Sequence, residues 1–138
     1  MAARRPQPRF PEPDTQPFWE ATKRHELVYQ TCNQTNEVVF YPRRHSAYCA
    51  SGESTWRVSK GLGTVYTFTV IMQSRHPAFA ELGPYAVAYV DLDEGFRMMT
   101  NIVGVKDPLK DIHCGMRVKL RWEDQGEGDI SLPMFEPA

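Results

Sequence analysis

The sequence predicts a mainly β protein with a short N-terminal helix, a small β ribbon and a five-stranded barrel. The chain has 138 residues, which is enough for one ordinary domain or two very small ones and too few for a large catalytic core. Short runs of β-favouring residues separated by polar turns fill the chain from Glu26 onward, and one helical pattern precedes them. Apolar residues make up 41% and charged residues 24%, which is typical of a globular protein with a packed core.

The first element after an N-terminal arm is a helix. Residues 1–13 combine arginines and prolines without the apolar stretch of a signal peptide, so they predict a flexible arm. Asp14 and Thr15 can cap a helix, and Pro17 suits its first turn. We therefore expect a helix near residues 16–25.

Three short β runs follow the helix, and cysteines lie in the polar turns between them. The runs are 27–29, 38–41 and 54–58. This layout is typical of a small β ribbon, so residues 14–60 are expected to form a helix and a ribbon.

Residues 61–138 contain five further strand patterns. The longest predicts a strand with Tyr66, Phe68, Val70 and Met72 on one face and Val65, Thr67, Thr69 and Ile71 on the other. The others are 85–92 and 96–103, joined by a tight turn at Asp93-Glu94-Gly95, then 116–123 and the closing segment 130–135. Because closure protects the edges of so small a sheet, these strands predict an OB-fold barrel.

The segments that connect or precede the strands also allow predictions. Segment 104–115 contains Pro108 and little helical periodicity, so no helix is expected there. The glycines at 61 and 63 precede a strand and predict a barrel bulge rather than a phosphate-binding turn. Loop 73–84 is long enough to be functional or mobile.

Loop 73–84 is the expected partner-binding segment, with Arg75, His76 and Phe79 as its candidate contacts. No alternation buries Phe79, so we expect it to be exposed and able to insert into a partner. A small local cluster around its ring is the competing interpretation.

Charge and cysteine number limit the partners and the location. The net charge is -1 and the pI is about 6.4, which lacks the basic excess of nucleic-acid-binding proteins. Residues 1–60 hold nine Lys and Arg against six Asp and Glu, whereas residues 61–138 hold seven against eleven. No apolar run reaches the roughly 20 residues that span a bilayer. Three cysteines cannot all pair within the chain, which favours a reducing cytoplasm.

The cysteine spacing is that of half a zinc site. A zinc ribbon needs two CxxC knuckles, but Thr35 and Ser46 stand where the second thiolates would be beside Cys32 and Cys49. His45 is next to Ser46 in the sequence, but it does not occupy a ligand position of the CxxC spacing. We expect a remnant ribbon that binds no zinc, because two thiolates leave a zinc site open.

No catalytic residue is assigned. Cys114 follows His113 directly, and neighbours on an extended segment point to opposite faces, so the pair does not form a nucleophile with its base. Four basic residues in and after the ribbon can contact the phosphates of an acyl-CoA or form an ordinary wet surface: Arg43, Arg44, Arg57 and Lys60.

Taken together, these segments resemble the acyl-CoA-associated family of small proteins that combine an N-terminal helix, a rubredoxin-like zinc ribbon and a C-terminal OB-fold. The resemblance rests on residues 17–20, Leu27, Cys32, 42–43, 49–51, Trp56, 61–69 and 132–135. The family usually has cysteines where Thr35 and Ser46 stand, and the branch that pairs with steroid aldolases has lost the metal.

The resemblance implies a non-catalytic accessory subunit of a thiolase-like acyl-CoA enzyme, in a hetero-oligomer. Its leading partner is a lipid-transfer-protein type retro-aldolase, a lyase of bacterial steroid side-chain degradation; another acyl-CoA thiolase or synthase is the alternative. No cofactor is expected on this chain itself, and acyl-CoA is contacted only in the complex. Two further hypotheses stay open. One is an OB-fold module that binds single-stranded nucleic acid by stacking its bases on Tyr66, Phe68, Tyr85 and Tyr89. The other is a small enzyme that uses Cys114.

Overall fold

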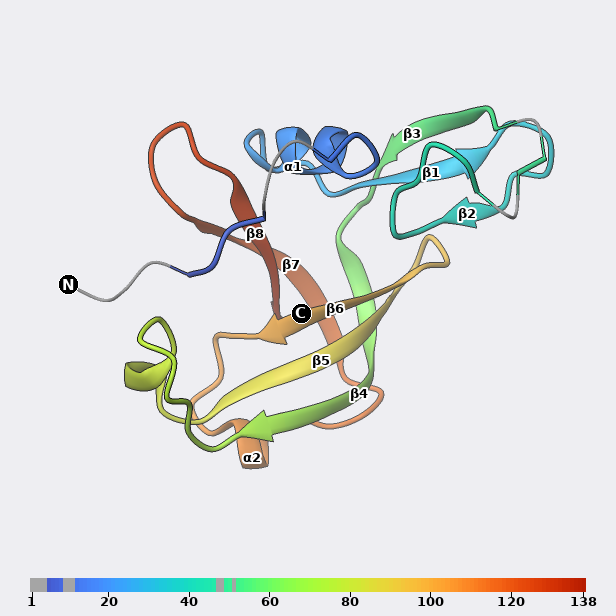
Figure 1. Cartoon of the computed structure of the whole chain (residues 1–138). Coiled ribbons are helices and arrows are strands. Elements are labelled where there is room, and N and C mark those ends of the chain that lie inside the picture. Colours follow the sequence, from blue (N-terminus) through green and yellow to red (C-terminus); the bar gives the residue numbers. More distant parts are fainter. Residues whose placement is uncertain (1–4, 9–11, 47–48, 51) are drawn as a thin grey trace.

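A computed structural model describes residues 5–8, 12–46, 49–50 and 52–138. Figure 1 shows a three-stranded ribbon that projects from one end of a five-stranded barrel, with the helix α1 between the ribbon and the β7–β8 hairpin. The mainly β fold predicted from the sequence is therefore confirmed. No helix in the described part of the chain is long and apolar enough to cross a membrane.

Helix α1 spans Gln16–Thr22 and is shorter than the expected 16–25. Thr15 occupies the predicted N-cap position, but neither it nor Asp14 makes a side-chain capping hydrogen bond. Thr15 has a helical backbone conformation, whereas a capping residue needs an extended one, and its Oγ1 lies 3.3 Å from Glu12 Oε2. Asp14 instead accepts a hydrogen bond from the backbone N of Arg44 at 3.1 Å, which ties the start of the helix to the ribbon.

The ribbon consists of β1 (Val28–Cys32), β2 (Val38–Val39) and β3 (Ser54–Val58), in the order β2-β1-β3. Both pairings are antiparallel, so Gln30 in the central strand lies between Val39 and Trp56. Every residue of β1 is buried. The three predicted β runs therefore form the expected ribbon.

The barrel contains five strands in the order β4-β5-β6-β8-β7, and the pairing of β7 with β4 closes it. They are β4 (Leu62–Ile71), β5 (Tyr85–Leu92), β6 (Arg97–Ile102), β7 (Arg117–Asp124) and β8 (Ser131–Pro137). All neighbours are antiparallel except β6 and β8, which meet in parallel. This is the OB-fold predicted from the sequence, and Gly95 has a φ of 98° in the predicted hairpin turn.

A β-bulge in β4 overturns the predicted faces of that strand. Val65 lies opposite Val90 and Thr67 lies opposite Tyr89, so Tyr66 is an extra residue. Val65 is 1% exposed and Tyr66 is 54% exposed, and Phe68 is half-buried. The alternation therefore slips by one residue at Tyr66, which the local pattern did not reveal.

The glycines before the bulge allow neighbouring strands to approach closely. A Cβ on Gly61 would lie 2.6 Å from Cβ of Leu120, and a Cβ on Gly63 would lie 2.6 Å from the carbonyl oxygen of Asp91. The bulge predicted at these glycines is thus wrong in position, because the glycines instead let β4 pack against both of its neighbours.

The connections also contain short helices. A single turn, α2 (Pro108–Asp111), forms where none was predicted, because Asp107 accepts a hydrogen bond from the N of Leu109 at 3.0 Å and Pro108 occupies the first helical position. A 3₁₀ turn, η1 (Ala80–Leu82), lies in the long loop before β5.

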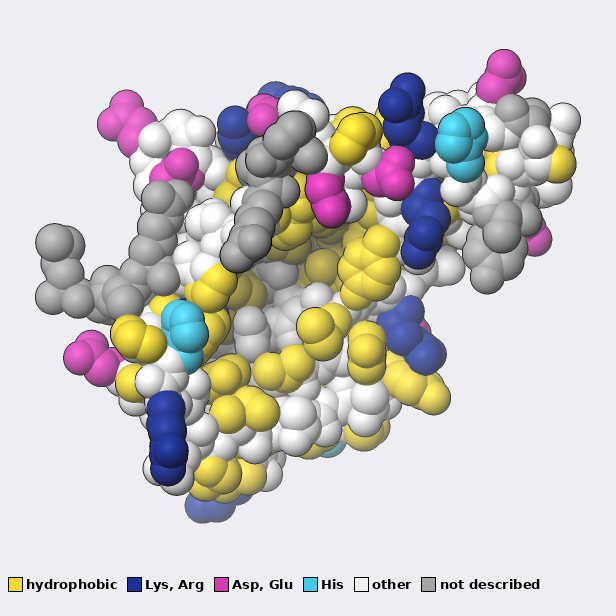
Figure 2. Space-filling view, viewed as in Figure 1, with side chains coloured by type: hydrophobic (Ala, Val, Ile, Leu, Met, Phe, Trp, Pro, Cys, Tyr) yellow, Lys and Arg dark blue, Asp and Glu magenta, His cyan; other side chains and the backbone are white. Residues whose placement is uncertain are grey.

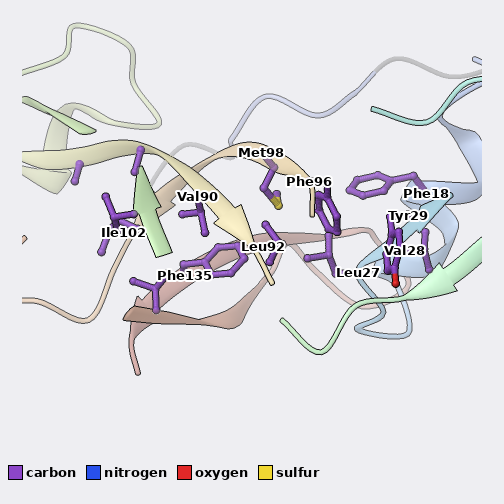
Figure 3. Packing of buried hydrophobic residues seen from close by; sticks show 14 of the residues in the cluster. Phe18, Leu27, Val28, Tyr29, Val90, Leu92, Phe96, Met98, Ile102 and Phe135 are labelled. Carbon is purple, nitrogen blue, oxygen red and sulfur yellow. The ribbon is translucent and has the colours of Figure 1, made fainter. Parts of the chain in front are cut away.

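The helix, the ribbon and the barrel share one hydrophobic core. Figure 3 shows Phe96 and Met98 between Val90 and Phe135 of the barrel on one side and Leu27, Tyr29 and Phe18 on the other. The Phe96 ring lies 5.1 Å from that of Tyr29. The Glu94 carboxylate also joins the modules, since its Oε1 accepts hydrogen bonds from the backbone N of Lys60 at 2.6 Å and from the Ser59 hydroxyl.

Candidate functional site

The two ribbon cysteines are joined to each other. Cys32 ends β1 and Cys49 lies in the turn before β3, and the two form a disulfide with their Cα atoms 5.4 Å apart. Both residues are buried. The interpretation of two separate remnant thiols is therefore corrected. A location in a reducing cytoplasm stays a prediction, and a disulfide is unusual in such a compartment.

The donor set around this link does not fit zinc. The two sulfurs bond to each other, and Thr35 is an exposed hydroxyl that accepts a hydrogen bond from the N of Glu37 at 3.3 Å. No group of three or more His, Cys, Asp or Glu that could hold a metal occurs among residues 5–8, 12–46, 49–50 and 52–138. A structural zinc site needs four such ligands.

The structure separates the basic residues proposed for CoA phosphates. Successive strand residues face opposite sides of a sheet. The backbone of Arg43 is paired to the Gln30 amide at 2.9 and 3.1 Å, which holds that loop over the Gln30 side of the ribbon. Arg57 Nε instead donates to Thr31 Oγ1 at 3.0 Å, on the opposite side. The Arg57 head group thus lies on the opposite side of the ribbon from the Gln30 amide that holds the backbone of Arg43.

The other two basic residues are exposed at two different places. Lys60 is exposed in the linker between ribbon and barrel, while Arg44 is exposed beside the start of α1. A contact between any of the four and CoA stays a prediction.

Loop 73–84, the predicted partner-binding segment, packs more closely against the rest of the protein than expected. Phe79 is half-buried, which corrects the expectation of an exposed side chain. Its ring lies 5.7 Å from that of Tyr85 and 5.2 Å from that of His76, and the Arg5 guanidinium lies 5.2 Å from its centroid. The local cluster weighed as an alternative is therefore present. Arg75 and His76 remain exposed.

The N-terminal arm has partners on the barrel. Arg4 and Arg9 lie outside the described residues. Arg5 forms an ion pair with Glu123 of β7, and Gln7 donates to Gln125 at 3.2 Å. The sequence did not lead us to expect these contacts in a segment predicted to be flexible.

The groups that could carry catalysis do not form a constellation. Cys114 is exposed in a turn next to His113, and no hydrogen bond joins the two in the structure as described. His25 stacks on Trp122 and its Nε2 lies 2.6 Å from Asp124 Oδ1, a partner that the sequence did not suggest. Ser131 Oγ donates to the same carboxylate oxygen, so His25 does not lie between a nucleophile and the acid.

The outward residues of β5 and β6 form an apolar surface, whose tyrosines the sequence analysis named only for the stacking of nucleic acid. Tyr85 and Tyr89 come to the same side of β5, and Tyr66 of β4 lies near Tyr89, under the Arg97 guanidinium. Phe68, grouped with these tyrosines in the nucleic-acid reading, is turned inward by the bulge. Met99 of β6 is 56% exposed next to them. The missed signal is that Tyr85, Val87 and Tyr89 make the outward side of β5 apolar up to Asp91, while its inward side is apolar throughout.

Two carboxylates outside this surface have lowered pKa values. The Arg117 guanidinium donates to both oxygens of Asp93 at 2.8 and 2.7 Å and holds the pKa of that carboxyl below its usual 3.8. Hydrogen bonds from Ser131, and then from His25, lower the pKa of Asp124. Each charged carboxylate is therefore stabilised in the folded protein more than in the unfolded chain.

These two pairs predict acid sensitivity. A lowered folded pKa stabilises the protein above the unfolded pKa near 3.8, and the contribution is lost as the pH falls through the folded pKa. We expect Asp93→Asn to lower the melting temperature at pH 7 by about 2 °C and to have a smaller effect at pH 3. Glu127→Gln, at an exposed carboxylate, is the control. Equal effects of Asp93→Asn at both pH values would contradict the assignment.

Two family models match the chain. One describes the rubredoxin-like zinc ribbon domain of ChsH2 and covers residues 19–54, and the other describes the C-terminal OB-fold domain of ChsH2 and covers residues 56–123. The boundary between them falls at the start of β3, close to the predicted division at residues 60 and 61.

Three curated relatives are similar in sequence. The chain is 38% identical over 122 residues to a probable enoyl-CoA hydratase alpha subunit of Thermomonospora curvata. It is 32% identical over 129 residues to the 3-oxo-4,17-pregnadiene-20-carboxyl-CoA hydratase alpha subunit of Mycobacterium tuberculosis. These matches cover 88% and 90% of the chain but only 37% and 38% of the relatives, so the chain spans less than two fifths of their length. A DUF35 domain-containing scaffold protein of Methanocaldococcus jannaschii is 29% identical, with 82% of each chain covered.

Two solved structures share the fold. A chain of the Ltp2-ChsH2(DUF35) aldolase superimposes with a TM-score of 0.83 and 35% identity, covering 95% of this chain and 98% of that one. A DUF35 protein of unknown function from Sulfolobus solfataricus has a TM-score of 0.65 at 12% identity, with 91% and 86% covered, and so shows the fold alone.

Proposed function

Because this chain belongs to the ChsH2 family of paired ribbon and OB-fold domains, we propose that it is a non-catalytic accessory subunit of a thiolase-like aldolase that acts on acyl-CoA thioesters. The observation that carries the proposal is the match to a chain of the Ltp2-ChsH2(DUF35) aldolase over nearly the full length of both chains. The scaffold name of the Methanocaldococcus relative supports a structural role.

The side chains of this protein also support a non-catalytic role beside a catalytic partner. Within the described residues, the only free cysteine is exposed beside a histidine to which it is not bonded. The hydroxyls of Ser131 and Ser59 donate directly to the carboxylates of Asp124 and Glu94, with no histidine between hydroxyl and acid as in a serine triad. The hydratase activity named for the longer relatives is not carried over, since the chain spans less than two fifths of them.

The proposed reaction of the complex is a retro-aldol cleavage of a β-hydroxyacyl-CoA that carries a steroid ring system. Breaking the bond between Cα and Cβ releases a short acyl-CoA and leaves a ketone on the steroid. The steroid-CoA substrate named for the Mycobacterium tuberculosis relative supports this substrate class. A thiolase or synthase for other acyl-CoA thioesters is the alternative partner.

Reconstitution tests the proposal. We expect an Ltp2-type subunit from the same organism to co-purify with this chain and to lose at least about tenfold in turnover when this chain is left out, which corresponds to about 1.4 kcal/mol in the barrier. Turnover is measured as release of short acyl-CoA, with this chain alone as the control. Full turnover by the partner alone, or any turnover by this chain alone, would contradict an accessory role.

A further inference from the structure

The outer side of β4, β5 and β6 carries an apolar surface. We call it the β5 face and define it by Thr67 of β4, by Tyr85, Val87 and Tyr89 of β5, and by Met99 of β6. Tyr89 lies between Thr67 and Met99 in the strand register, and Val87 is two residues along on the same side. Figure 2, in the same view as Figure 1, shows hydrophobic side chains spread over these three strands.

The barrel core does not account for the β5 face. The inward residues of β5 are Ala86, Ala88, Val90 and Leu92, and each is at most 3% exposed. A strand with one side on the core and the other in water alternates apolar and polar residues, whereas apolar residues on both sides are typical of a strand covered twice. The outward tyrosines and valine therefore indicate that a second surface covers β5.

The β5 face continues onto the ribbon through Met99. Strand β6 pairs with β8 only at Ile102, so its edge at Met99 is open and the backbone N of Met99 donates to the Tyr41 hydroxyl at 3.3 Å. Met99 lines a hollow of about 300 Å³ on the β5 face and another of about 250 Å³ between β6, α1 and the ribbon. Tyr41 is 53% exposed at the rim of the second hollow.

The charges around the β5 face do not favour nucleic acid. Arg97 is the cation at its hairpin end, and its guanidinium lies over the Tyr66 ring at 3.5 Å. The same guanidinium donates to both oxygens of Asp91 at 2.6 and 3.1 Å, so its charge is neutralised within the sheet. A surface that tracks phosphates needs unpaired basic residues, whereas a neutral apolar surface is complementary to another protein.

The exposed area fits a protein interface. Tyr41, Tyr66, Tyr89 and Met99 are between 43% and 56% exposed. At about 200 Å² for a large side chain, they leave on the order of 400 Å² in contact with water. A stable interface buries about 800 Å² per partner, of which somewhat more than half is apolar. Tyr89 and Met99 of the face, together with the adjoining Tyr41 and Tyr66, come close to that apolar share.

We propose that the β5 face, extended by Tyr41, is the surface that the thiolase-like subunit covers. This inference rests on the proposed function and places the interface on the barrel face and the adjoining Tyr41 rather than on the predicted loop 73–84. The loop residue Phe79 packs against Tyr85 at the far end of the face and forms its border, so it contributes by shaping the surface more than by inserting into the partner.

Charge insertion tests the assignment. Tyr89→Glu and Met99→Glu are expected to raise the Kd for the thiolase-like subunit at least thirty-fold, because each places a carboxylate in the centre of an apolar interface. Leu109→Glu is the matched control, since Leu109 is 57% exposed on α2, outside the face, and we expect a change below about twofold. Isothermal titration calorimetry measures the Kd, and circular dichroism checks that each variant is folded.

The outcomes separate the two proposals. If the wild-type chain binds the subunit and both face variants bind it as tightly, the β5 face is not the interface, while the accessory role stands. If the wild-type chain does not bind the subunit at all, both proposals fail. Self-association that Tyr89→Glu abolishes, or salt-sensitive binding of an oligothymidine, would assign the face to a second copy or to nucleic acid and overturn the inference.

Discussion

Replacing Phe135 by alanine is expected to lower the free energy of unfolding by about 3 to 5 kcal/mol. Phe135 is 0% exposed and lies in β8, where its carbonyl oxygen accepts a hydrogen bond from Val103 N at 2.8 Å and its Cα pairs with those of Ile102 and Leu120. The side chain fills the core at the one place where β8 bridges β6 and β7. Its removal leaves a cavity at the closure of the barrel.

Urea denaturation at 25 °C measures this effect. Phe79→Ala removes the same side chain from a half-buried loop position and is expected to cost less than about 1.5 kcal/mol. Phe135→Leu keeps most of the volume and stays measurable if the alanine variant does not fold. A loss for Phe135→Ala no larger than that for Phe79→Ala would show that β8 does not close the barrel.

Reducing the Cys32–Cys49 disulfide is expected to lower the free energy of unfolding by about 3 kcal/mol. The link closes a loop with a sequence separation of 17, and restricting a loop of that length in the unfolded chain contributes about that amount in the chain-entropy treatment. Urea midpoints with and without a reductant measure the effect without changing any side-chain volume. Cys114→Ser is the control, because it removes the exposed cysteine and should keep the full response to the reductant.

Thiol and metal counts on the same preparation check the cause. We expect one titratable thiol in the denatured, non-reduced protein, three after reduction, and less than about one zinc per ten chains. Three thiols before reduction, or close to one zinc per chain, would contradict the disulfide and restore the ribbon as a metal site.

The proposed accessory role requires a contact surface of the kind that the β5 face provides. A subunit that contributes no catalytic group acts by stabilising or shaping its partner, and this requires a large apolar contact rather than a small polar site. The serine–carboxylate pairs of the described residues, which have no histidine between hydroxyl and acid, and the uncovered tyrosines of β5 are therefore consistent with one function.

Local patterns were sufficient for most of the architecture. The strands of the ribbon and barrel follow from apolar residues at a spacing of two, and the hairpin at Gly95 follows from the need for a positive φ, which are properties of a few consecutive residues. The helix near Pro17 and the final strand at 130–135 were predicted in the same way. The lack of a second cysteine in each knuckle is read directly from the sequence.

Only the tertiary structure decided how distant residues meet. The bulge at Tyr66 depends on the register of β4 against β5, and the link between Cys32 and Cys49 depends on the return of the chain along the ribbon. The half-burial of Phe79 results from contacts with Arg5 and Tyr85, which are remote from it or beyond the loop. The β5 face exists because pairing aligns Tyr89 with Met99. Each is set by pairing between segments, because a residue's own neighbours do not specify which strand will lie beside it or at what register.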